Sequence, residues 1–184
     1  MEWVFDGGRP CLDLVNTLRS RYEAGVELLT GPDALAEWLS LAGFTTGPVP
    51  VTAGHVLAAK ALREAIDRVL LPPEVPERMD IDLVNNAAAA APAPPPRLAL
   101  VDGVLRREVP VPKDPVAAAF AALAADAIDL ATSGAAVRVC AADDCGQRFC
   151  DASPRRNRQW CSMARCGNRA KARAHYARAI TRND

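Results

Sequence analysis

Two stretches near the C-terminus, Cys140-Ala-Ala-Asp-Asp-Cys145 and Cys161-Ser-Met-Ala-Arg-Cys166, decide how the last quarter of the chain folds. Fifteen residues separate these two Cys-x4-Cys pairs, and four cysteines at such spacing are typical of one tetrahedral zinc ion. Four thiolates leave no open position for water or substrate, so we expect the ion to be structural. Two cysteines five residues apart could instead be small apolar residues of one helix, but the polar stretch that ends in Gly146 indicates a turn.

The other two of the six cysteines do not fit this tetrahedron. Cys150 would add a fifth thiolate where zinc takes about four ligands, so we expect a half-buried thiol. Cys11 lies in an apolar stretch and is expected in the core. Because residues 1–8 lack the basic and apolar segments of a secretory signal, we expect a reducing, cytoplasmic location. Paired cysteines in that location bind metal more often than they form disulfides.

The charge of this 184-residue chain is unevenly distributed, although its formal net charge is zero. Residues 138–184 contain 11 of the 22 lysines and arginines but four of the 22 acids, which gives +7, and residues 1–137 carry −7. A zinc ion bound by four thiolates would leave the tail at +5. A basic module on an acidic body is typical of proteins that bind a polyanion. No run reaches the roughly 18 consecutive apolar residues of a membrane helix, so we expect no membrane partner.

Residues 1–134 predict a mainly helical domain. Apolar residues at helical spacing, with proline at the starts and glycine or proline at the ends, predict five helices. They cover about 10–18, 30–43, 52–71, 76–90 and 114–130. In the first helix, Asn16 and Thr17 are expected to point away from the apolar face.

One β-hairpin interrupts this helical pattern near residues 97–109. Asp102-Gly103 joins two short apolar-rich runs, Arg97 to Val101 and Val104 to Val109. Asp-Gly is favoured in a type I′ turn, which needs positive φ at both central residues. The preceding Ala-Pro-Ala-Pro-Pro-Pro, residues 91–96, is a stiff spacer in which a helix cannot continue.

The remaining residues, 135–184, predict a small zinc module that follows a Thr-Ser-Gly linker. Strands are expected on either side of the first cysteine pair, at 137–139 and 147–150. The helix-forming sequence from Ala164 onward places the second pair at a helix N-terminus, where the helix dipole favours a negative zinc–thiolate cluster. Two ligands on a hairpin and two at a helix start give a treble-clef-like module. The chain is therefore predicted to be an α+β protein, mainly helical, with domains at 1–134 and 135–184.

The positive charge of the zinc module gathers in a turn and on one face of the C-terminal helix. The seven candidate nucleic-acid contacts are Arg155, Arg156 and Arg158 in the turn and Lys171, His175, Arg178 and Arg182 on the helix. At 1.5 Å per residue this helix face is about 16 Å long. It could meet several DNA phosphates, which are spaced about 7 Å apart along a strand. An arginine-rich helix face is also commonly just solvated, so the pattern alone does not decide.

The opposite face of this helix is expected to pack against the rest of the protein. Tyr176 and Ile180 are its apolar anchors. Arg169 and Arg173 could cover apolar surface with their stems or reach outward to a carbonyl or to solvent. His175 is not expected to bind zinc, because nine residues of helix put it about 13 Å from the last cysteine.

The second cysteine pair and the residues after it resemble a known family. Cys166-Gly167-Asn168-Arg169 is the signature for which the CGNR zinc finger family is named, and the first pair also matches that family's first knuckle. Phe5-Asp-Gly-Gly-Arg-Pro-Cys-Leu-Asp-Leu-Val-Asn-Thr17 and Leu29-Thr-Gly-Pro-Asp-Ala-Leu-Ala-Glu-Trp-Leu39 are similar to the ABATE domain that accompanies this finger. The resemblance implies a bacterial, stress-induced transcription regulator whose finger binds DNA or RNA. Cys150 stands where this family leads us to expect an apolar or aromatic residue.

Four polar residues around the first helix are candidates for a small-ligand pocket that could couple to the finger. They are Arg9, Asp13, Asn16 and Thr17. The alternative is that they cap the first helix and pack it against Gly7-Gly8. The sequence names no effector in either case.

Together these observations favour a zinc-containing nucleic-acid-binding protein, a bacterial transcription regulator whose N-terminal domain senses a ligand or forms a homodimer. DNA is the first partner expected and RNA the second. The alternative is a protein-interaction module whose basic finger docks on an acidic partner or on its own N-terminal domain. An enzyme is not expected, because the sequence has no Ser/His/Asp set, no glycine-rich phosphate loop and no open metal site, and its only histidines are His55 and His175.

Overall fold

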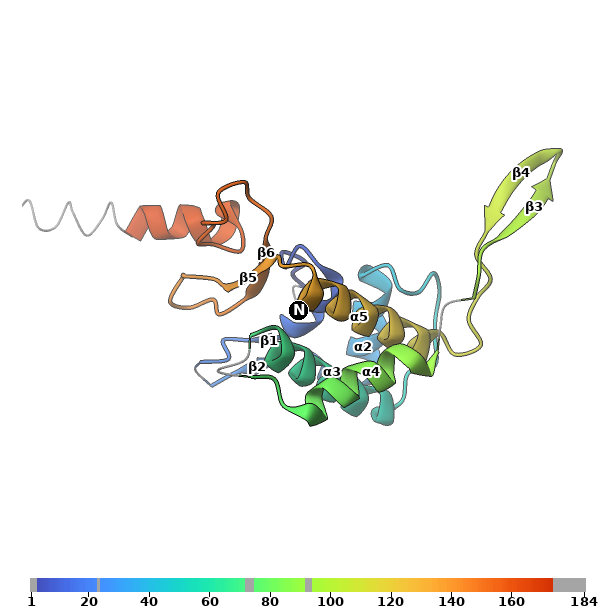
Figure 1. Ribbon diagram of the computed structural model, residues 1–184, viewed down its shortest axis with the longest axis horizontal. Coiled ribbons are helices and arrows are strands. Elements are labelled where there is room, and N and C mark those ends of the chain that lie inside the picture. Colours follow the sequence, from blue (N-terminus) through green and yellow to red (C-terminus); the bar gives the residue numbers. More distant parts are fainter. Residues whose placement is uncertain (1–2, 23, 72–74, 92–93, 174–184) are drawn as a thin grey trace, which may run out of the picture.

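The computed structural model describes residues 3–22, 24–71, 75–91 and 94–173. A mainly helical N-terminal region with small hairpins is followed by a β-hairpin and a helix that carry a four-cysteine cluster (Figure 1). This arrangement confirms the predicted fold class. The elements are α1 (Pro10–Val15), β1 (Leu18–Arg19), β2 (Val26–Glu27), α2 (Pro32–Leu41), α3 (Ala53–Leu70), α4 (Arg78–Ala90), β3 (Arg97–Val101), β4 (Val104–Glu108), α5 (Pro115–Thr132), β5 (Ala136–Val139), β6 (Arg148–Asp151) and a π-helical turn, η1 (Met163–Gly167), which continues as helix to residue 173.

Capping residues set the helix boundaries. The Thr52 hydroxyl accepts a hydrogen bond from the backbone N–H of His55, whose ring accepts one from the backbone N–H of Thr52. The Asp114 carboxylate accepts the first two free N–H groups of α5 in the same way. Gly43 ends α2 with φ +79°, the left-handed conformation that glycine adopts without strain. Five predicted helices are therefore confirmed, with ends that shift by a few residues.

The helical core surrounds α5. This helix matches a membrane span by length and hydropathy alone, but here it packs against α1, α3 and α4 as the central helix of the N-terminal region (Figure 1). Trp38 of α2 is 1% exposed and lies between the rings of Phe5 and Phe44, with centroids 6.3 and 6.1 Å away. Cys11 is fully buried in this core, as expected.

The end of α1 differs from the prediction. The helix stops at Val15, before Asn16 and Thr17, which are expected to point away from its apolar face and are only 4% and 1% exposed. Each side chain is buried with partners: the Thr17 hydroxyl donates to the Leu14 carbonyl at 2.7 Å and accepts from Arg63 at 3.3 Å. Helical periodicity could not reveal this burial, because it depends in part on partners such as Arg63 that lie far away in the sequence.

Asn16 instead pairs with the zinc module. Its side-chain amide donates to the carbonyl of Arg148 at 2.9 Å and accepts from the N–H of Arg148 at 2.8 Å. One asparagine side chain thus satisfies both backbone groups of a β6 residue, as a neighbouring strand would. The next bond along β6 runs from the Cys150 N–H to the carbonyl of Gly7 at 2.8 Å. Strand β6 is therefore docked on the start of the chain over several residues.

The Arg148 side chain completes this docking. Its guanidinium donates two hydrogen bonds to the Asp67 carboxylate of α3, at 2.7 and 3.0 Å, and stacks over the Tyr22 ring at 5.3 Å. The two side chains of the ion pair are only 7% and 14% exposed. A planar guanidinium and a carboxylate matched in this way form the stronger, geometrically specific kind of ion pair.

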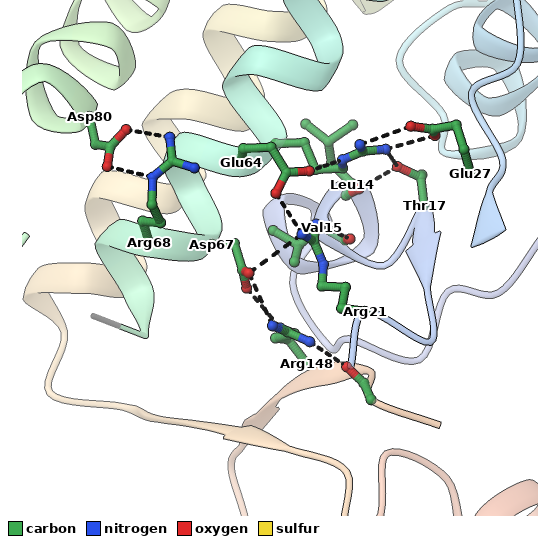
Figure 2. Close-up of polar contacts among 12 residues, drawn as sticks. Leu14, Val15, Thr17, Arg21, Glu27, Glu64, Asp67, Arg68, Asp80 and Arg148 are labelled. Carbon is green, nitrogen blue, oxygen red and sulfur yellow. Dashed lines mark hydrogen bonds and ion pairs between the residues drawn. The ribbon is translucent and has the colours of Figure 1, made fainter. Parts of the chain in front are cut away.

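Charges of alternating sign continue from Asp67 through the protein, as Figure 2 shows. Arg21 contacts both Asp67 and Glu64, and buried Arg63 bonds to Glu64 and to Glu27 of β2. Burial opposes ionisation of Glu27, but the hydrogen bonds from Arg63 and the Leu29 N–H, together with the positive charges of Arg63 and Lys60, outweigh it and lower the pKa of this carboxyl. The network therefore ties β2, α3 and β6 together while every charge keeps a partner of opposite sign.

We expect Asp67→Ala to lower the free energy of unfolding by about 3 kcal/mol, because it leaves the buried Arg148 guanidinium without its main counter-ion. The matched control is Asp82→Ala, which breaks an ion pair with Arg78 whose side chains are 50% and 86% exposed. That change should cost about 0.5 kcal/mol or less. Urea unfolding followed by circular dichroism gives both values, and equal costs for the two variants would contradict a structural role of the docking pair.

Candidate metal centre

Four cysteine sulfurs come together in the C-terminal module. The Sγ atoms of Cys140, Cys145, Cys161 and Cys166 all lie within 4.8 Å of one another, and all four are free thiols. Two Sγ–Sγ distances, from Cys161 to Cys145 and to Cys166, are 3.7 Å. Four sulfurs about 2.3 Å from a tetrahedral zinc would lie roughly 3.8 Å apart. The cluster therefore has the size and composition of a closed zinc site.

The backbone brings these sulfurs together from two elements. Cys140 follows β5, and its N–H donates to the Gln147 carbonyl at 2.8 Å across the hairpin. Gly146 closes the intervening turn with φ +63°. The other two cysteines flank the start of η1, where the Ser162 hydroxyl accepts from the N–H of Arg165. A hairpin turn and a helical turn thus each contribute two ligands, as the sequence spacing predicts.

The electrostatics of the cluster favour a cation. Hydrogen bonding by Cys161 lowers the pKa of Cys145 to about 5, so one thiolate forms readily. That hydrogen bond to Cys145 and burial raise the pKa of Cys161, and burial raises the pKa of Cys166 to about 11. Cys161 and Cys166 therefore resist ionisation unless a positive ion offsets the repulsion. A divalent, sulfur-preferring ion such as zinc fits this donor set, and it would leave no position for substrate.

A small core supports the cluster from one side. Phe149 of β6 is fully buried beside the cysteines. The guanidinium of Arg158 lies 4.8 Å from the Phe149 ring centroid and donates to the Trp160 and Cys161 carbonyls. The Arg158 side chain thus stabilises the backbone next to a predicted zinc ligand. From the sequence alone, Arg158 is one of the candidate nucleic-acid contacts of the turn.

The other candidate nucleic-acid contacts fall into two groups. Arg155, Arg156 and Lys171 are exposed, and Arg156 donates to the Gly134 carbonyl at 3.2 Å. Within the described residues, no side-chain hydrogen bond or ion pair involves Arg155 or Lys171. The other predicted contacts on the helix, His175, Arg178 and Arg182, lie outside the described residues. The two predicted apolar anchors, Tyr176 and Ile180, also lie outside them.

Arg169 and Arg173, for which the sequence left two alternatives, both bond to one acid. Their guanidinium groups donate to the Asp144 carboxylate at 3.0 and 3.1 Å. Arg169 also lies 3.6 Å from the Cys166 sulfur. These two arginines therefore connect the helix after η1 to the first knuckle.

Sequence reasoning missed the residues that join the zinc module to the helical region. Besides Arg148, these include Arg165, whose guanidinium bonds to the Asp6 carboxylate and lies 3.4 Å from the Gln147 side-chain oxygen. In the sequence, the segments that contain these two arginines stand out only for their cysteines. The acidic partners of the arginines are more than 80 residues away. Local patterns contain no signal for such pairs.

The four residues of the predicted ligand pocket form hydrogen bonds within the protein. Arg9 bonds to Asp126 of α5 at 2.8 Å, and the Asp13 carboxylate accepts from the Gly7 N–H at 2.9 Å. Asn16 and Thr17 have the partners described above. These contacts agree with capping and packing around α1. A ligand pocket at these residues stays a prediction.

Half-buried Cys150 lies outside the cysteine cluster. It packs against the helical core, and its backbone is bonded to Gly7. Its exposure is what the sequence predicts for a thiol that does not bind the metal.

Two protein families match consecutive parts of the chain. Residues 8–134 match the ABATE family, described as "Putative stress-induced transcription regulator", and residues 136–179 match the CGNR zinc finger. No curated protein matches the chain. Neither family is one of enzymes, and the second match contains all four clustered cysteines.

Cys145→Ser should abolish stoichiometric zinc binding, because three remaining thiolates leave the tetrahedron open. Far-ultraviolet circular dichroism should retain most of its helical signal, since the N-terminal helices have a core of their own. Cys150→Ser is the matched control and should still bind one zinc per chain, measured by elemental analysis after dialysis. One zinc per chain in Cys145→Ser would contradict the ligand assignment.

Asp13→Asn should stabilise the protein at alkaline pH. Burial raises the pKa of Asp13 to about 6, above its ordinary 3.8, despite the hydrogen bond from Gly7. A raised carboxyl pKa favours the folded state fully only below pH 4, and that contribution is lost as the pH rises through 6. Asparagine keeps an acceptor for Gly7 without the charge, so we expect a gain of about 1–2 kcal/mol at pH 8 that shrinks towards pH 5. Urea unfolding across this range tests it against exposed Asp33→Asn, and a loss of stability at pH 8 would contradict it.

Proposed function

Because this chain belongs to the ABATE family and carries a CGNR zinc finger, we propose that it is a bacterial, cytoplasmic transcription regulator that binds nucleic acid, foremost DNA, through the zinc module. The four-cysteine cluster stabilises this module and takes no part in chemistry. The N-terminal region supports the module and serves sensing or self-association.

The observation that carries this proposal is that some of the module's arginines are paired with its own acids, whereas other cations in its described part are exposed and unpaired. Asp144 and Asp151 are neutralised inside the module, by Arg169 and Arg173 in the first case and by Arg138 in the second. Exposed Arg155 and Lys171 have no acid beside them in the described part of the chain. In the described part of the module, exposed Arg155, Arg156 and Lys171 therefore outnumber the one exposed acid left without a partner, Asp143, and this positive excess favours phosphate as the partner.

The alternative, a finger that docks on its own N-terminal region, has one specific observation in its favour. Arg148 and Arg165 bond to Asp67 and Asp6 of that region. These arginines are not the exposed ones, so docking uses a different part of the module from the one proposed to bind phosphate. The two interactions are compatible, and docking then fixes how the exposed residues are presented.

Salt dependence of binding tests the proposed function. The observed association constant should fall with salt at a logarithmic slope of about −0.9 per phosphate contact on duplex DNA. Arg155→Ala with Lys171→Ala should therefore flatten the slope by about 1.8, while zinc content stays at one per chain. Fluorescence anisotropy with a labelled random duplex and a labelled RNA hairpin, over a series of salt concentrations, measures the slope for each.

The matched control removes two exposed cations of the N-terminal region, Arg97→Ala with Lys113→Ala. It should leave the slope unchanged. If both double variants have the same slope as the unmodified chain, the zinc module does not bind phosphate through Arg155 and Lys171. A tighter complex with the RNA hairpin would assign RNA as the partner.

A further inference from the structure

The β3–β4 hairpin is an arm that projects from the helical body at the end opposite to the zinc module (Figure 1). Among the described residues its two strands pair only with each other, from Arg97 opposite Glu108 to Val101 opposite Val104. Asp102 and Gly103 form the tip, with φ of +51° and +76° as a type I′ turn requires. An isolated two-stranded hairpin is marginally stable in water, so an arm of this kind favours a partner that covers one of its faces.

The register of the hairpin gives its two faces different chemistry. Directly opposite residues of an antiparallel pair share a face, and successive pairs alternate between faces. Leu98 pairs with Arg107, and Leu100 pairs with Leu105, so these four residues form one face, here called the leucine face. Its three leucines are 77%, 71% and 67% exposed. The opposite face carries the Arg97–Glu108, Ala99–Arg106 and Val101–Val104 pairs and is mixed in polarity.

Proline keeps the arm away from its own helical body. Pro94, Pro95 and Pro96 precede β3, and Pro110 and Pro112 follow β4. Proline fixes φ and favours extended, semi-rigid segments. With both stems stiffened in this way, the arm cannot readily fold back to cover its leucines. The leucine face is therefore left for another molecule.

We propose that a second copy of this chain covers the leucine face, with the two hairpins packed face to face and pointing in opposite directions. Leu100 and Leu105 form the middle row of the face. The row of Leu98 and Arg107 lies two residues to one side, and the tip residue Asp102 lies two residues to the other. A two-fold axis that crosses the strands at the middle row then sets Arg107 of each copy opposite the Asp102-Gly103 tip of the other.

This arrangement is self-complementary in charge as well as in shape. The Leu98–Arg107 row and the tip lie about 13 Å apart at 3.3 Å per residue, so the long Arg107 side chain of each copy can reach the tip carboxylate of the other at the same time, on either side of six leucines. In the described residues, neither Asp102 nor Arg107 has a side-chain hydrogen bond or ion pair within its own chain. An acidic or a purely apolar partner would satisfy only part of this face.

The pairing surface is small, and its size sets the expected strength. Standard interfaces bury about 1,600 Å² in total, and two five-residue strands from each copy offer less. We therefore expect a dimer in equilibrium with monomer at micromolar concentrations. The zinc modules would lie at the two outer ends of such a dimer (Figure 1). If the proposed function holds, one dimer presents two basic modules to separate sites on a nucleic acid.

Sedimentation equilibrium of the full, zinc-loaded chain, without nucleic acid, tests this pairing from low micromolar to near-millimolar concentration. Leu100→Thr with Leu105→Thr keeps β-forming residues and should give monomer throughout. The matched control on the opposite face, Val101→Thr with Val104→Thr, should dimerise like the unmodified chain. Arg107→Glu should raise the dissociation constant of the dimer about tenfold or more, because it puts a second acid next to the Asp102 carboxylate at the tip of the partner copy. Arg106→Glu, the adjacent arginine on the opposite face, should leave that constant unchanged.

Three results would overturn the inference. The first is an unmodified chain that stays monomeric at every concentration. The second is a dimer that survives Leu100→Thr with Leu105→Thr, which would place the interface elsewhere. The third is an equal effect of Arg107→Glu and Arg106→Glu on the dissociation constant, which would contradict the proposed antiparallel packing of the two hairpins. Because no nucleic acid is present, none of these outcomes depends on the proposed function.

Discussion

Four thiols that lie within 4.8 Å of one another impose the constraint on which the C-terminal module depends. One of them ionises easily, and its hydrogen bonds and charge then hold back ionisation of its neighbours. A cation that binds all four removes this conflict and joins a hairpin turn to a helical turn, two elements too small to form a core alone. Phe149, Trp160 and Arg158 add the little packing that the module has. Exposed Arg155 lies in the turn that leads to Cys161 and exposed Lys171 in the helix that follows Cys166, so the positions of both depend on this cluster.

The module is in turn held by a matched set of polar groups, which add to the packing of Val137 and Cys150 against the helical core. The Asn16 amide bonds to both backbone groups of Arg148, and the Arg148 guanidinium bonds to Asp67. These contacts are buried, directional and charge-assisted, so they fix orientation as well as proximity. The alternating charges from β2 to β6 therefore give a defined connection between the module and the helical region, as the proposed function requires.

The elements could largely be predicted from the sequence because their determinants are local. Asp114 and Thr52 mark helix starts, and Asp102-Gly103 marks a hairpin whose turn angles match the prediction. The four clustered cysteines could also be predicted, because ligand spacing is a local property. The docking of Arg148 could not, since its partners Asn16 and Asp67 lie 132 and 81 residues away. Burial of Asn16 and the inward orientation of Arg158 were missed for the same reason: tertiary partners override the local pattern.

X-ray absorption at the zinc K-edge of the purified, full-length protein tests the central claim most directly, because it reports the identity and distance of the atoms around the ion. A closed structural site predicts four sulfur neighbours at about 2.3 Å and no oxygen or nitrogen in the same shell. Fewer than four sulfurs, or a light-atom neighbour at about 2.0 Å, would show an open or mixed site. Such a result would contradict a module organised by Cys140, Cys145, Cys161 and Cys166.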